Sequence, residues 1–115
     1  MTAPVSGWVD VGPVADIPLQ GARVVRTGHG DIAVFRTAAG TILAVEDRCP
    51  HKGGPLSQGI VHGDMVTCPL HNWVISLKTG EAQGADVGCV QTIAVRVEGD
   101  RVMLSAAGLV ALQAA

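Results

Sequence analysis

Aromatic residues are scarce in this sequence, and that scarcity limits how its core can be built. Phe and Trp together make up 3% of the 115 residues, and Tyr is absent. Apolar residues nevertheless account for 48% of the chain, so it can bury a core, and Val, Ile, Leu and Ala must fill it. This length is enough for one domain and too short for two. We therefore expect a single domain over residues 1–115.

Charge of one sign and long hydrophobic runs are also lacking. The formal net charge is −2, and no run of Lys or Arg forms a basic stripe, which argues against a nucleic-acid-binding protein. No stretch approaches the roughly eighteen apolar residues of a membrane helix. Residues 1–7 contain neither a basic segment nor an apolar run, so we expect no signal peptide and a cytoplasmic location. No G-x-G-x-x-G turn is present to hold a nicotinamide or flavin nucleotide.

Turn-forming residues and short β-rich runs dominate what is present. The chain has 15 Gly and 6 Pro, and helical periodicity is weak almost everywhere. The pattern predicts an all-β domain, a small antiparallel β-sandwich or barrel with two irregular loops at one end. Residues 106–115 are Ala-rich and are expected to form a short helical end or a tail. Strands are expected at residues 8–11, 23–27, 32–37, 41–45, 65–67, 73–77, 92–98 and 101–105.

Two pairs of potential metal ligands stand in the middle of the chain. They are Cys49-Pro50-His51 and Cys68-Pro69-Leu70-His71, with sixteen residues between them. Two Cys and two His form the ligand set of a two-iron, two-sulfur centre with His on one iron, and zinc can use the same donors. Structural zinc sites usually place Cys with Cys and His with His. Here each pair supplies one of each, so each loop can reach both irons, and the arrangement favours the cluster.

A simpler alternative needs no metal at all. The two Cys could be buried thiols or a labile disulfide, and the two His could be solvated loop residues. Two matched pairs, each with Pro directly after the Cys, argue against that interpretation.

The residues around the two pairs resemble Rieske [2Fe–2S] proteins. Residues 48–59 and 68–75 resemble the small subunit of assimilatory NAD(P)H-dependent nitrite reductase, and residues 78–82 and 86–89 continue the resemblance. The resemblance implies a Rieske-type fold with a [2Fe–2S] cluster. The ligands it implies are Cys49, His51, Cys68 and His71.

The same resemblance implies a function and a partner. The chain would be an accessory electron-transfer subunit of an oxidoreductase, with no catalytic residue of its own. The partner would be the large subunit, which holds flavin, a [4Fe–4S] cluster and siroheme and reduces nitrite to ammonium in nitrate assimilation. No nucleic acid and no membrane is expected as a partner.

Two other functions fit the same residues. The first is a free-standing Rieske ferredoxin that supplies electrons to a ring-hydroxylating dioxygenase. The second is a non-redox subunit, holding zinc or no cluster and serving as a scaffold. Asn72-Trp73-Val74-Ile75 and Gly88-Cys89 favour the nitrite reductase branch.

Departures from the respiratory Rieske proteins indicate a low potential. Those proteins carry an extra Cys in each loop, and the two form a disulfide, whereas Gly54 and Leu70 occupy the corresponding places here. They also supply Ser and Tyr hydroxyls to the cluster, whereas Asn72, Trp73 and Val74 follow the second His. We therefore expect a reduction potential near about −150 mV, at the low end of the Rieske range.

The remaining chemistry-bearing residues are expected to have structural roles. We expect Cys89 to be a buried small thiol near the loops and Trp73 to pack under the second loop. Residues expected at the surface, in turns or beside the first loop are His29, His62, Glu46 and Asp47.

Overall fold

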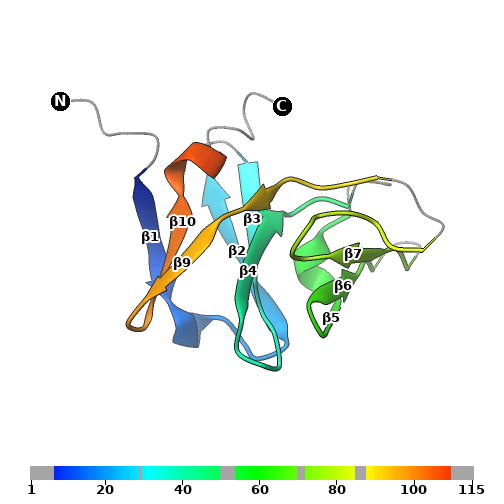
Figure 1. Cartoon of the computed structure of the whole chain (residues 1–115), viewed down its shortest axis with the longest axis horizontal. Coiled ribbons are helices and arrows are strands. Elements are labelled where there is room, and N and C mark those ends of the chain that lie inside the picture. Colours follow the sequence, from blue (N-terminus) through cyan, green and yellow to red (C-terminus); the bar gives the residue numbers. More distant parts are fainter. Residues whose placement is uncertain (1–6, 29, 50–53, 70–71, 85–87, 110–115) are drawn as a thin grey trace.

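The computed structural model of the chain describes residues 7–28, 30–49, 54–69, 72–84 and 88–109 (Figure 1). This part consists almost entirely of short strands, with two 3₁₀ helices and a helical turn at residues 106–109. No helix in it is long and apolar enough to cross a membrane. The elements are β1 (Trp8–Pro13), η1 (Val14–Asp16), β2 (Gly21–Thr27), β3 (Gly30–Arg36), β4 (Ile42–Glu46), η2 (Leu56–Gln58), β5 (Ile60–His62), β6 (Met65–Thr67), β7 (Val74–Ser76), β8 (Thr92–Ile93), β9 (Val95–Glu98) and β10 (Arg101–Ser105).

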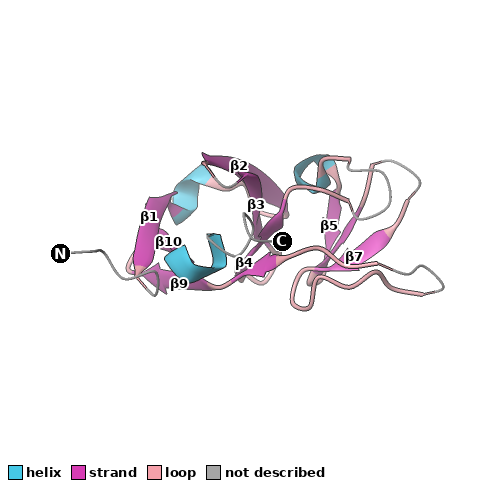
Figure 2. Cartoon of the chain, turned by 90° about the horizontal axis from the view of Figure 1, so that it is seen from above, coloured by secondary structure: helices cyan, strands magenta, loops and turns pink. Residues whose placement is uncertain are grey.

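The strands form three antiparallel sheets arranged one after another along the molecule (Figures 1 and 2). The distal sheet has the order β1-β10-β9, and the middle sheet has the order β2-β3-β4-β8. The loop sheet has the order β5-β6-β7 and lies at the opposite end from the distal sheet. The predicted all-β antiparallel fold is therefore confirmed.

The middle sheet is covered on both faces. Four successive residues of β3, Ile32 to Phe35, have 0% exposed surface. Ile32 and Val34 pack with buried residues of the distal sheet, and Ala33 and Phe35 pack with buried residues of the loop sheet. Successive side chains point to opposite faces of a strand, so a strand between two layers requires this unbroken apolar run. Burial of each large side chain contributes about 1.5–3 kcal/mol.

The predicted strand at residues 92–98 is two strands that belong to different sheets. In β8, Ile93 pairs with Ala44 of the middle sheet, and in β9, Val97 pairs with Val102 of the distal sheet. Ala94 lies at the break, and its carbonyl accepts the Ser105 N–H at 3.0 Å. The alternating sequence gave no sign of this change because both halves turn apolar residues toward the same core.

The other predicted strands are found close to their expected places. The three runs from residue 23 to 45 form the meander β2-β3-β4, and β9 and β10 form a hairpin around Gly99, whose φ is +61°. The region from residue 46 to 59 contains η2, and β5 follows as a strand that the sequence pattern did not predict. That strand has three residues, and Ile60 is 71% exposed, so it carries too little apolar periodicity to be recognised.

Candidate metal centre

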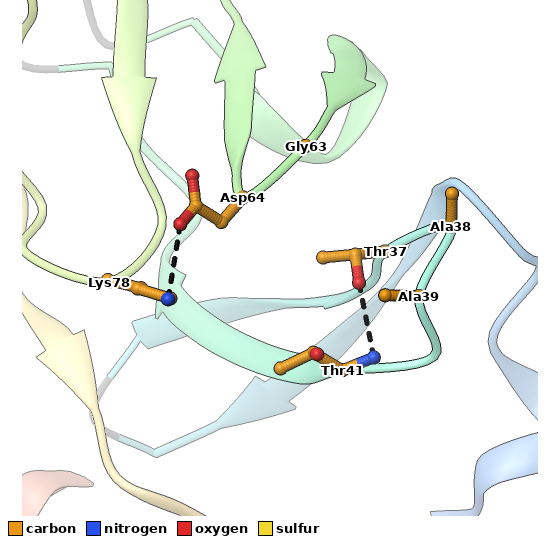
Figure 3. A pocket seen from close by; sticks show the side chains of 7 residues that line it. All are labelled: Thr37, Ala38, Ala39, Thr41, Gly63, Asp64 and Lys78. Carbon is orange, nitrogen blue, oxygen red and sulfur yellow. Dashed lines mark hydrogen bonds and ion pairs between the residues drawn. The ribbon is translucent and has the colours of Figure 1, made fainter.

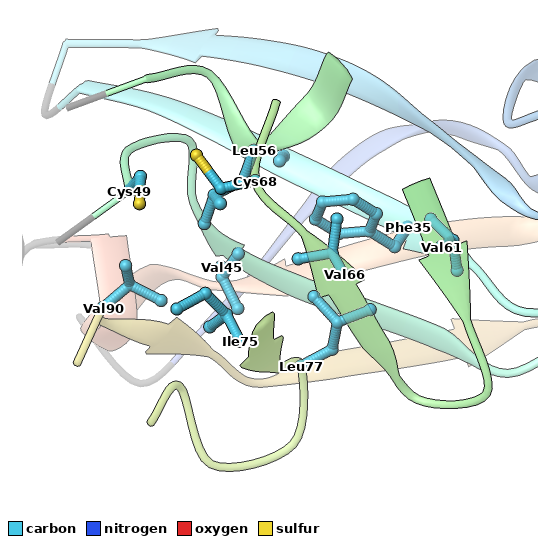
Figure 4. Packing of buried hydrophobic residues seen from close by; sticks show 11 residues of the cluster. Phe35, Val45, Cys49, Leu56, Val61, Val66, Cys68, Ile75, Leu77 and Val90 are labelled. Atoms are coloured by element: carbon cyan, nitrogen blue, oxygen red, sulfur yellow. The ribbon is translucent and has the colours of Figure 1, made fainter. Parts of the chain in front are cut away.

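Two cysteines from separate parts of the chain enter the same buried cluster at the loop-sheet end. Cys49 lies just beyond the end of β4, and Cys68 directly follows β6. Their exposed fractions are 1% and 0%. Figure 4 shows both thiols among apolar side chains, with Leu56 and Ile75 in the same cluster.

The backbone closes each cysteine into a loop in the same way. The Cys49 N–H donates to the Gly54 carbonyl at 2.8 Å, and the Cys68 N–H donates to the Trp73 carbonyl at 2.7 Å. In both cases the acceptor stands five residues further along the chain. We call residues 49–54 the first loop and residues 68–73 the second loop. Both cysteine amides are thus engaged within their own loops, and neither is free to donate to a sulfur atom.

The donor chemistry fits an iron–sulfur cluster. Soft thiolates favour iron–sulfur clusters and zinc over hard cations, and a charged thiolate in an apolar interior needs a cation beside it. Cys49 and Cys68 are free cysteines in the structure and share one apolar cluster. A [2Fe–2S] cluster held there would supply one-electron redox chemistry.

The two predicted histidine ligands cannot be placed. His51 and His71 lie outside the described residues, as do Pro50 and Leu70. The ligand set Cys49, His51, Cys68 and His71 therefore stays a prediction, of which the structure brings the two cysteines together.

The second loop contains a residue in the left-handed region. Asn72 has a φ of +59°, a conformation that side chains other than Asn, Asp and Gly rarely adopt. It stands directly before Trp73, whose carbonyl closes the loop. Asn72 thus lets the chain reverse and return to β7.

Asp47 is held in a network rather than left on the surface as predicted. Its Oδ1 accepts the Ser57 backbone N–H at 2.8 Å, and its Oδ2 accepts the Ser57 hydroxyl at 2.8 Å. Ser57 belongs to η2, whose preceding residue, Pro55, offers no side-chain acceptor. The unpaired N–H groups at the start of a helix need an acceptor, and Asp47 provides it from ten residues upstream. That separation is why sequence reasoning missed the pair.

The prediction for Cys89 is wrong. Cys89 is exposed, whereas its neighbour Val90 is buried and packs in the cluster that holds Cys49. Its backbone forms a bridge with Glu81. Adjacent residues of an extended chain point to opposite sides, so burial of Val90 turns the Cys89 thiol outward.

Trp73 and His62 behave as predicted. Trp73 is half-buried and packs against the cluster that contains both cysteines. His62 is exposed at the end of β5, and its Nε2 lies 2.7 Å from the Thr67 hydroxyl. His29 lies outside the described residues.

A surface recess of about 460 Å³ lies beside the turn that joins β3 to β4 and the turn that joins β5 to β6 (Figure 3). Lys78 Nζ and Asp64 Oδ2 are 3.3 Å apart beside it, and both side chains are substantially exposed. Its lining includes no cysteine or histidine among the described residues, so it is not part of the metal centre. The lining residues are Thr37, Ala38, Ala39, Thr41, Gly63, Asp64 and Lys78.

The fold, the two buried cysteines and the paired loops together define an iron–sulfur electron-transfer domain. The family model for the Rieske [2Fe-2S] domain matches residues 7–103. The chain therefore belongs to the Rieske [2Fe-2S] domain family, as its resemblance predicted. Membership implies a [2Fe–2S] cluster as the cofactor.

Relatives of known function span several redox systems. The ferredoxin component of the naphthalene 1,2-dioxygenase system of Pseudomonas aeruginosa is 31% identical over 98 residues, covering 84% of this chain and 93% of that protein. The 4beta-methylsterol monooxygenase of Methylococcus capsulatus is 55% identical over 56 residues, which are 49% of this chain and 15% of that enzyme. The chain thus spans less than a fifth of the length of such oxygenase relatives.

Solved structures share the fold closely. A protein assigned as the small subunit of an NADPH nitrite reductase superposes with a TM-score of 0.77 at 25% identity, covering 85% of this chain and 97% of that one. A chain from the oxygenase–ferredoxin complex of carbazole 1,9a-dioxygenase gives a TM-score of 0.76 at 27% identity, covering 86% and 93%.

Proposed function

We propose that this chain is the Rieske small subunit of an assimilatory NAD(P)H-dependent nitrite reductase. The observation that carries the proposal is the run Asn72-Trp73-Val74-Ile75, which follows the second ligand pair and resembles that branch. This run also builds the site, because Asn72 reverses the chain and the Trp73 carbonyl closes the second loop. The similarity to a solved protein assigned as such a small subunit supports the same partner.

In this role the chain transfers single electrons and the partner performs the reaction. The partner is a larger subunit that holds flavin and siroheme and reduces nitrite to ammonium. The ligands in this proposal are Cys49, His51, Cys68 and His71. Asn72, Trp73 and Val74 stand in place of the Ser and Tyr hydroxyl donors of respiratory Rieske proteins. This supports a low potential, because hydrogen bonds to the cluster are one of the factors that set it.

The test uses the purified, cluster-loaded chain and the large subunit. The chain is reduced without oxygen and mixed with the large subunit, and its visible absorption is followed after nitrite is added. We expect nitrite-dependent reoxidation that requires the large subunit and is lost in the His71→Ala variant. If the reduced chain stays reduced, or if iron-free chain supports full nitrite reduction, the electron-transfer role in this enzyme is wrong.

A second candidate is a ferredoxin for a ring-hydroxylating dioxygenase. It is favoured by the 31% identity to the naphthalene dioxygenase ferredoxin component over nearly its whole length. The same reduced chain is then mixed with a dioxygenase, its aromatic substrate and oxygen. Faster reoxidation by the dioxygenase than by nitrite reductase would favour this second function.

A further inference from the structure

The ends of the two loops are held in different ways. The second loop is flanked by β6 and β7, which pair with each other up to Thr67 and Val74. These two residues stand at the ends of the second loop, so the strand ladder fixes its width. The first loop follows β4 and leads into η2, and no strand pairing joins those two elements within the described residues. Besides the inner Cys49–Gly54 bond, one further contact holds its ends together.

Asp47 and Ser57 make that contact. They stand outside the first loop on either side, and the Asp47 carboxylate accepts both the backbone N–H and the hydroxyl of Ser57, each at 2.8 Å. Hydrogen bonds to an ionised carboxylate are stronger than those between neutral groups. The pair lies partly buried, so water competes with it less than at an exposed site.

One end of this contact is tied to the middle sheet and the other end to the core around the cysteines. The Asp47 backbone N–H donates to the Asp31 carbonyl at 2.9 Å, which ties it to β3 beside the middle sheet. On the other side, Leu56 precedes Ser57 in η2, is 0% exposed and packs in the cluster with Cys49 and Cys68. The contact therefore joins two rigid parts of the molecule across the base of the first loop.

We propose that Asp47 is a positioning residue for the metal centre, and that its two bonds to Ser57 hold Cys49 and Gly54, the two ends of the first loop, at the separation that cluster binding needs. Cys49 lies two residues beyond Asp47, and the inner Cys49–Gly54 bond nests inside the outer Asp47–Ser57 bond. The outer bond takes the place of the strand ladder that the second loop has. The proposal rests on cluster ligation by Cys49 and His51 and is independent of which enzyme receives the electrons.

The test is a double-mutant cycle on the rate at which an iron chelator removes the cluster from the loaded protein. Asp47→Ala removes both bonds, whereas Ser57→Ala removes only the hydroxyl bond. We expect Asp47→Ala to accelerate cluster loss roughly tenfold to a hundredfold, the range for one or two hydrogen bonds to a charged group, and Ser57→Ala to have a smaller effect. In the Asp47→Ala background the Ser57→Ala change should have no further effect, because its partner is already gone.

Controls separate positioning from general stability. Asp64→Ala removes an exposed carboxylate, which pairs with Lys78, and it should lose its cluster at the wild-type rate. Ser57→Thr keeps a hydroxyl and should restore most of the retention. The reduced Asp47→Ala protein should also show a broadened paramagnetic signal, which a loss of folding stability alone would not produce.

Two results would overturn the proposal. One is an Asp47→Ala protein that loses its cluster at the wild-type rate and keeps an unaltered paramagnetic signal. The other is a full, independent effect of Ser57→Ala in the Asp47→Ala background. Because the assay contains no partner protein, a failure of the nitrite reductase assignment leaves its outcome unaffected.

Discussion

Cys68 and Trp73 are joined by a backbone hydrogen bond of 2.7 Å that closes the second loop. Asn72, one residue before the acceptor, has a φ of +59°. A residue with an ordinary side chain is strained there by roughly 1–2 kcal/mol, whereas Gly is not. We expect Asn72→Ala to lower the unfolding free energy by about 1 kcal/mol, as measured by denaturant unfolding. Asn72→Gly should stay near wild type, and equal losses in both variants would show that the Asn side chain itself is required.

Gly59 directly follows η2 and packs against β6, the strand that leads into Cys68. A Cβ at this position would overlap the Thr67 carbonyl oxygen and lie 2.8 Å from Val66 Cγ2. Overpacking of this kind costs about 1–3 kcal/mol. Gly59→Ala should therefore lower the unfolding free energy by that amount and reduce the iron content of the purified protein. Gly28→Ala is the control, because no atom lies within 4 Å of its added Cβ, and it should fold and load normally.

The Phe35 side chain lies in the core between the middle sheet and the loop sheet. Its side chain is 0% exposed and belongs to the cluster that contains Cys49 and Cys68. Phe35→Ala should lower the unfolding free energy by about 3–5 kcal/mol, and Phe35→Leu should lose less because more volume is kept. Thermal or urea unfolding of the two variants measures the difference. A loss below 1 kcal/mol for the Ala variant would contradict the packing described above.

The ligand set predicts a clear division among the three cysteines. Cys68→Ser and His71→Cys should abolish the rhombic paramagnetic signal that is typical of mixed Cys and His ligation, because each changes a ligand of the cluster. Cys89→Ser should leave the signal intact, because that thiol is exposed and outside the buried cluster. Electron paramagnetic resonance on freshly loaded protein measures all three. A full signal in Cys68→Ser would remove this residue from the ligand set.

Asp10 and Arg101 link the first strand to the last at the distal sheet. The pKa of Asp10 lies below its usual value, mainly because the Arg101 guanidinium donates to its carboxylate, and also because the Gly12 N–H donates to it. A lowered folded-state pKa favours folding above the unfolded-state pKa, and the contribution is lost as pH falls through the folded value. Wild type should therefore exceed Asp10→Asn in unfolding temperature at neutral pH. The difference should shrink on acidification below pH 4, and a constant difference would contradict this assignment.

The sequence predicted correctly those features that depend on a few neighbouring residues. Glycine turns and β-rich runs located most strands, and two Cys/His pairs with matched Cys-Pro steps predicted the Rieske family. Each of these patterns spans only a few residues, so it can be recognised without knowledge of the fold.

The features that were missed depend on distant parts of the chain. The break at Ala94 is set by which sheet each half of the segment meets, and the outward turn of Cys89 is set by burial of Val90. The Asp47–Ser57 contact joins residues ten positions apart, one of them in a 3₁₀ helix of three residues. None of these leaves a periodic pattern in the sequence.

The burial of β3 on both faces makes its backbone the part of the molecule that is hardest to expose to solvent. Amide hydrogens exchange with solvent only where the backbone opens, and the free energy of opening varies across a structure. The amides of β3 lie beneath two layers and between two neighbouring strands, so we expect them to exchange only when the whole domain unfolds. The loop sheet covers one face of the middle sheet, and its edge strand β5 has three residues. We therefore expect the loop sheet to open at a lower free-energy cost than the middle sheet, and its amides to exchange before those of β3.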